Sequence, residues 1–133
     1  MNKKQEIKEL AETHIKTRFD FSPSVNFKPS EYGYSFELSN MIADLGNCDF
    51  KRKKIQLNEG YALDESTSKG EIIDMLLHEI AHAAVFEKFN RTGHCDLWKT
   101  KCRILGANPD RENYSYEEWQ KKLIEESLGF TQN

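Results

Sequence analysis

Residues 68–89 read SKGEIIDMLLHEIAHAAVFEKF, and this stretch decides the fold. Its apolar side chains recur at helical spacing and cover an unusually broad surface, which predicts a central, mostly buried helix over about residues 70–89. Ser68 and Glu71 have the spacing of a capping box, so we expect the helix to begin there. Within the helix, residues 78–82 form the pattern H-E-x-x-H.

This pattern predicts a zinc site. Two histidines four residues apart, His78 and His82, lie on one face of a helix and can reach the same ion, while Glu79 lies beside a bound water. Two neutral imidazoles and one further ligand leave a tetrahedral position open for that water. Glu79 is therefore the predicted general base. Three titratable residues in the most apolar helix would be costly to bury without a metal or another partner.

A third ligand must come from elsewhere in the chain. The metzincin extension is excluded, because Val85 and Lys88 stand where that class has glycine and histidine. His94 is the best-placed ligand, although it could instead cap the next helix, and Asp96 is a candidate to orient a ligand imidazole. A thermolysin-like site would instead use a glutamate from a following helix, for which the candidates are Glu112, Glu117 and Glu118.

The rest of the chain predicts an α+β fold with an N-terminal helix, a small sheet of two to four strands and further C-terminal helices. We expect antiparallel hairpins because the connections between strands are short. Trp98 and Trp119 are expected in the core. The expected elements are helices over about 3–18, 94–105 and from Ser115 towards Gly129, strands over about 32–38 and 53–57, and a short strand or turn over 45–49.

Composition favours one soluble domain over residues 1–133. The three cysteines have no C-x-x-C spacing and are expected to be reduced thiols. No apolar stretch near the start is long enough for a signal peptide or a membrane span, which predicts a cytoplasmic protein with no membrane partner.

Charge is unevenly distributed along a chain whose net charge is −3. Four consecutive cations, Lys51, Arg52, Lys53 and Lys54, are expected on an exposed strand beside the predicted metal cleft, and a second basic group surrounds His94. Such a strand could add an extended peptide, and its charges could contact an acidic peptide or a phosphate backbone such as DNA. The candidate contacts in the second group are Lys99, Lys101 and Arg103.

Three sequence blocks together resemble the SprT-like zinc metalloprotease domain. They are HEIAHAAV at 78–85, GHCDLWK at 93–99, and an upstream block with LGNCDF at 45–50 and IQLN at 55–58. The resemblance implies a zincin-like minimal fold, with His78, His82 and His94 as Zn²⁺ ligands, Glu79 as the base and a protein or peptide substrate. Relatives of the Spartan type act on proteins bound or crosslinked to DNA.

Two features depart from the family pattern. Cys95 stands in place of the usual glycine after the third histidine, and no separate zinc ribbon or DNA-binding domain is expected. The leading interpretation is a zinc endopeptidase. The alternatives are a zinc-stabilised adaptor that binds DNA or protein without protease activity, and a hydrolase of non-peptide amides or esters.

Overall fold

The computed structural model describes residues 2–17, 19–21, 25–110 and 115–129 and has the predicted α+β fold, with a small sheet of three strands that is mixed. A two-stranded hairpin precedes that sheet. In chain order the elements are α1 (Lys3–Lys16), β1 (Phe19–Phe21), β2 (Val25–Phe27), the 3-10 helix η1 (Pro29–Tyr32), β3 (Ser35–Ser39), β4 (Gly46–Asp49), β5 (Lys54–Asn58), α2 (Glu59–Leu63), α3 (Lys69–Phe89), α4 (Asp96–Leu105) and α5 (Tyr116–Ser127).

The short connections predicted antiparallel hairpins, which the structure confirms for β4 with β5 and corrects for β3 with β5. The order of the sheet is β3-β5-β4, with β5 parallel to β3 and antiparallel to β4. The chain leaves β3, forms the edge strand β4, and turns back so that β5 fills the gap between them. Residues 51–53 lie in the β4–β5 turn and Lys54 begins the central strand, so the basic run does not form the exposed strand that we expected.

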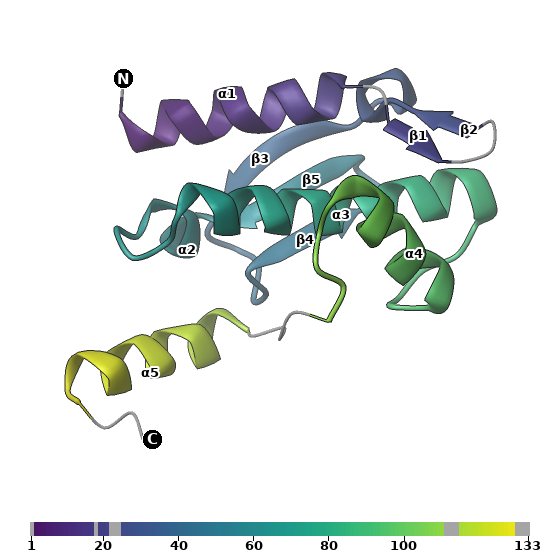
Figure 1. Cartoon of the computed structure of the whole chain (residues 1–133). Helices are drawn as coiled ribbons and strands as arrows, with labels where there is room; N and C mark the ends of the chain where they lie inside the picture. The colour runs from purple at the N-terminus through teal and green to yellow at the C-terminus, as the bar shows by residue number, and fades with distance from the viewer. Residues whose placement is uncertain (1, 18, 22–24, 111–114, 130–133) are drawn as a thin grey trace.

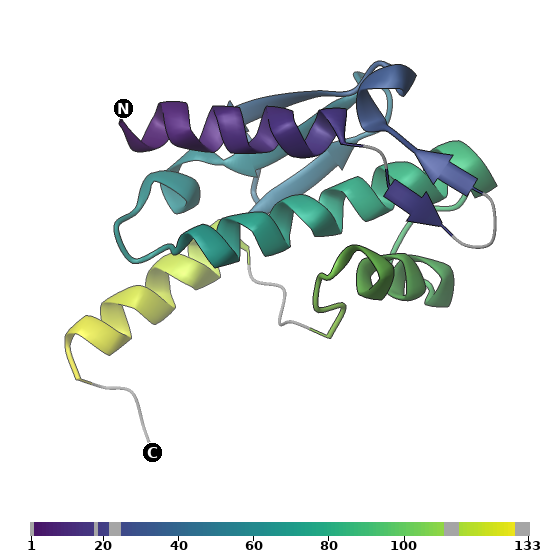
Figure 2. The same cartoon turned by 45° about the horizontal axis from the view of Figure 1, so that its top comes forward.

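Helices α1 and α3 lie alongside each other on one face of the sheet (Figures 1 and 2). Ile55 and Leu57 of β5 are fully buried and belong to the same core as the apolar faces of both helices. Gln56, which alternates with them, instead donates to Glu37 at 2.7 Å and accepts from Asn47 at 2.8 Å, joining the three strands through polar side chains. The sheet therefore has an apolar side that supports α3.

The predicted helix boundaries are confirmed closely. Helix α3 starts after Ser68, whose capping box with Glu71 is complete, and ends at Asn90 in the left-handed conformation. Helix α4 ends at Gly106, also left-handed, and Ser115 forms a second complete capping box at the start of α5. The short helix α2 was not predicted.

Helix α5 is joined to the body through its first turns and then leaves it (Figure 1). The Tyr116 ring lies so close to Gly60 that a Cβ there would be 2.2 Å from the phenol oxygen, and Trp119 packs edge-on against Tyr61 with ring centroids 5.3 Å apart. None of the described helices is both long and apolar enough to cross a membrane.

Candidate metal centre

The H-E-x-x-H residues lie on the central turns of α3, opposite β4 and close to the start of α4. His78 and Glu79 are buried, with 6% and 7% of their surfaces exposed, and His82 is half-buried. His94 is exposed and immediately precedes Cys95, which is the N-cap of α4. His94 therefore does not cap that helix.

A pocket of about 360 Å³ brings Glu79, His82 and His94 together. The imidazole rings of His82 and His94 are 5.0 Å apart between centroids. The opposite wall comes from β4 and the residues around it, including Asp44 and Cys48. The packing of α3 on β4, together with the reversal at Gly93, thus places a buried carboxyl group and two imidazoles around one cavity.

His78 faces a different part of the structure. Its Nε2 donates to the Asn108 carbonyl at 2.7 Å and lies 3.7 Å from an Asp74 carboxylate oxygen. The other Asp74 oxygen accepts from the Asn108 main-chain N–H at 3.0 Å, so the loop after α4 holds this pair. The predicted first ligand is therefore turned towards Asn108, and it does not line the pocket.

Burial sets the protonation of the pocket residues. Burial raises the pKa of Glu79 to about 8, with a smaller contribution from the negative charge of Asp44. Burial lowers the pKa of His82 to about 3, and the neighbouring His94 and His78 add to this effect. His82 is therefore a neutral imidazole near pH 7, the form that binds metals.

Gly46 leaves the space that Glu79 occupies. A Cβ at position 46 would be 2.7 Å from Cγ of Met75 and 3.0 Å from a carboxylate oxygen of Glu79. Because Gly46 has no side chain, the main chain of the edge strand β4 packs directly beside the carboxyl group of Glu79.

The other predicted contacts are dispersed. The side chain of Asp96 is exposed in the first turn of α4, whereas Asp74 is the carboxylate beside a histidine. Glu117 and Glu118 are exposed on α5, and Glu112 lies outside the described residues. Arg103 is exposed, Lys99 is half-buried, and Lys101 is buried with Nζ 5.6 Å from the centroid of the Phe89 ring.

Most of the basic run makes contacts within the protein. Arg52 pairs with Glu37 at 3.3 Å and with Asp49 at 3.8 Å, and Lys53 pairs with Glu87. Lys54 donates to the Ser35 hydroxyl at 2.7 Å.

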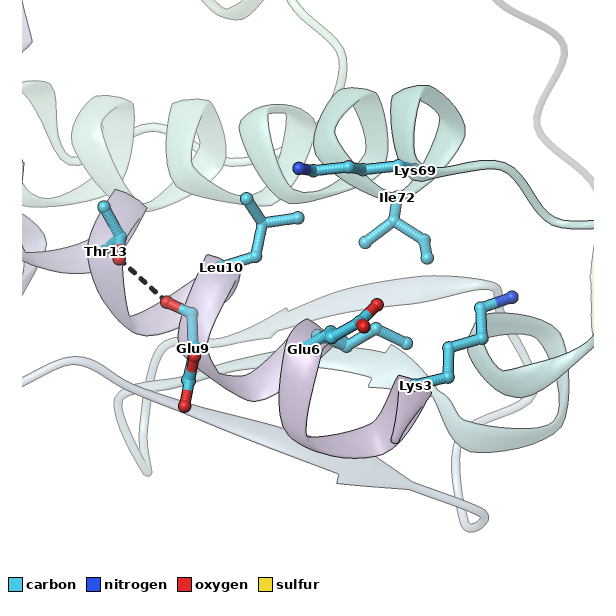
Figure 3. A pocket seen from close by; sticks show the side chains of 8 residues that line it. Lys3, Glu6, Glu9, Leu10, Thr13, Lys69 and Ile72 are labelled. Carbon is cyan, nitrogen blue, oxygen red and sulfur yellow. Dashed lines mark hydrogen bonds between the residues drawn. The ribbon is translucent and has the colours of Figure 1, made fainter. Parts of the chain in front are cut away.

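A second hollow, of about 320 Å³, lies between α1 and the start of α3 (Figure 3). Leu10 and Ile72 give it an apolar floor, and Lys3, Glu6 and Lys69 lie around it. It contains none of the residues that the sequence singled out for catalysis.

Sequence reasoning missed three residues at the candidate metal centre. Asp74 stands four residues before His78, a helical spacing that could have identified it as a partner. Asp44 and Gly46 adjoin Glu79 because β4 packs on α3. Gly46 belongs to the block LGNCDF that resembles the family, but the block alone does not show that it contacts Glu79.

A family model described as the SprT-like family matches residues 6–118. The chain belongs to the SprT-like family. Membership suggests a metalloprotease-related function, and this family is typically metal-associated. Comparison of this SprT-like chain with curated proteins and with solved structures gave no match.

The donor set of this SprT-like chain fits zinc in its chemistry, since neutral imidazoles and a carboxyl group are ligands that zinc takes. Within the described ranges, no three His, Cys, Asp or Glu side chains converge as a ready-made metal site. His82 is neutral and adjoins His94, and His78 lies one turn earlier on the same helix. The Nε2 of His78 is bonded to the Asn108 carbonyl, and His78 does not line the pocket that contains the other two.

Proposed function

We propose that the protein is a zinc-dependent endopeptidase in which His78, His82 and His94 hold the ion and Glu79 is the general base. The observation that carries this proposal is the pocket lined by Glu79, His82 and His94 between α3 and the edge strand β4. A structural zinc site would have no use for a buried carboxyl group beside its ligands.

The chemistry divides between the ion and the chain. A bound zinc ion would supply Lewis acidity, which polarises a peptide carbonyl and lowers the pKa of a water to roughly 7. Glu79 would accept a proton from the attacking water and deliver it to the leaving amide nitrogen. Burial favours the protonated form of Glu79, and a cation in the pocket would favour the carboxylate that this role requires.

An extended peptide is the substrate that the pocket wall favours. Strand β4 pairs with β5 along one side and lies at the edge of the sheet, and its residues Gly46, Asn47 and Cys48 line the pocket. A peptide added along that edge would make main-chain hydrogen bonds and pass beside Glu79. Proteins associated with DNA are the natural substrate class that the family resemblance implies.

The test compares wild type with Glu79→Gln on a disordered protein substrate, with zinc content measured for both. We expect the variant to keep its zinc and to lose about 100- to 10,000-fold in cleavage rate, the usual contribution of a general base. Glu117→Gln, on the exposed face of α5, is the matched control and should cleave normally. Equal cleavage by Glu79→Gln would exclude the general-base role, and a zinc-loaded wild type without peptidase activity would favour the adaptor.

A further inference from the structure

Trp98 of α4 contacts all three histidines that we propose as zinc ligands. Its indole stacks on His82, with centroids 4.8 Å apart and planes inclined by 16°. The His94 ring lies at 4.5 Å and the His78 ring at 5.4 Å, the latter edge-on. One aromatic side chain therefore backs the complete proposed ligand set.

The indole is itself held in place. Trp98 is 3% exposed, and its Nε1 donates to the main-chain carbonyl of His78 at 3.1 Å. This hydrogen bond ties α4 to the same turn of α3 that carries the H-E-x-x-H pattern. A fixed indole plane restricts the rotation of each imidazole that packs against it, and such restriction is what raises the affinity of a metal site.

We propose that Trp98 is a positioning residue of the metal centre, which orients the imidazoles of His82 and His94 and receives His78 when a metal binds. This inference rests on the proposed function, since it assumes that these histidines share an ion. It assigns Trp98 a role beyond the filling of the core that the sequence predicted.

A purely structural role would have different consequences. Trp98 also belongs to a small apolar cluster with Leu77, Ala81 and Val85 of α3. If packing were its whole contribution, a substitution would lower stability without a specific effect on metal affinity. Stability and metal affinity must therefore be measured separately.

The first measurement uses the two tryptophans as matched reporters. Trp119→Phe leaves Trp98 as the fluorophore, and Trp98→Phe leaves Trp119, which packs on Tyr61 and Tyr116. Titration with Zn²⁺ should change Trp98 emission saturably at one equivalent and leave Trp119 emission flat. Unchanged Trp98 emission in a protein whose bound zinc is confirmed by atomic absorption would overturn the proposal.

The second measurement is zinc affinity in competition with a chromophoric chelator. Trp98→Leu keeps apolar bulk but removes the ring, so zinc affinity should fall about 10- to 100-fold, as for other residues that orient metal ligands. Trp98→Phe keeps a ring face and should recover part of the loss. Urea unfolding of both variants with EDTA provides the stability correction. If Trp98→Leu does not fold, Trp98→Phe and the emission titration still decide.

The outcomes separate this inference from the proposed function. Wild-type zinc affinity in Trp98→Leu overturns the positioning role and leaves the peptidase proposal untouched. Reduced zinc affinity in Trp98→Leu, beside a wild type that binds zinc but cleaves no peptide, supports the positioning role and overturns the peptidase proposal. A wild type that binds no zinc overturns both.

Discussion

The pocket beside His82 and the basic run Lys51–Lys54 contain the two densest groups of ionisable residues that the sequence singled out. They differ in how their charges are compensated by neighbouring residues. In the run, Lys53 pairs with Glu87, and Arg52 pairs with Glu37 and Asp49. In the pocket, burial and the charge of Asp44 raise the pKa of Glu79. Charges compensated by neighbours stabilise a turn, whereas a buried group without such compensation is available for chemistry.

The largest expected effect comes from the removal of one pocket histidine. His94 is exposed and lies outside the helices, so His94→Ala should leave stability nearly unchanged. Zinc affinity should fall by at least about 100-fold, because a ligand matters more than the residues that orient it. Competition with a chelator measures this change. His14→Ala, on α1 with its ring bonded to the Leu10 carbonyl, is the matched control. Wild-type zinc affinity in His94→Ala would remove that residue from the site.

The next effect tests how closely β4 must approach the pocket. Gly46→Ala places a methyl group 2.7 Å from Met75 Cγ and 3.0 Å from Glu79, and overpacking of this kind costs about 1–3 kcal/mol. Cleavage should fall more than zinc affinity, because the groups that must move are Met75 and the proposed base Glu79, not the histidines. Gly70→Ala is the control, since its nearest contact would be the Ser68 hydroxyl at 3.9 Å. Urea unfolding measures the stability of both variants, and a cleavage assay measures their activity. Wild-type stability and wild-type cleavage in Gly46→Ala would show that β4 can shift to accommodate the added methyl group.

Contacts between residues close in sequence could be predicted, whereas contacts between residues far apart in the chain could not. Ser68, with its partner Glu71, predicted the start of α3 correctly because capping chemistry is local. The parallel pairing of β3 with β5 could not be read in the same way, since strand order depends on where a returning chain finds an open edge. The candidate metal centre likewise combines local contacts that the sequence predicts with distant contacts that it does not. Helical spacing placed His78 and His82 on α3, but the turn of His78 towards Asn108 depends on a loop 30 residues away in sequence.

A smaller effect is expected where the basic run meets α3. Glu87→Ala removes the acceptor of the Tyr34 hydroxyl, bonded at 2.8 Å, and the partner of Lys53, so unfolding free energy should fall by about 1–3 kcal/mol. Glu117→Ala is the matched control, because its pair with Lys121 is 3.5 Å long with side chains 80% and 71% exposed, and such pairs contribute less than about 1 kcal/mol. Urea denaturation measures both. Equal losses would show that the run is solvated rather than internally paired.

The smallest effect concerns Lys51, whose side chain makes no ion pair among the described residues. Lys51→Ala should change stability by less than about 0.5 kcal/mol. If a phosphate backbone lies beside the pocket, the same substitution should reduce the slope of log affinity against log salt concentration by about 0.7 for a short single-stranded DNA. Arg52→Ala should reduce it less, because Glu37 and Asp49 already hold that guanidinium. Equal reductions would mean that Arg52 leaves its ion pairs to contact DNA. The ion pairs of the turn would then not prevent its residues from binding a ligand, and the contrast with the pocket would not hold when DNA is bound.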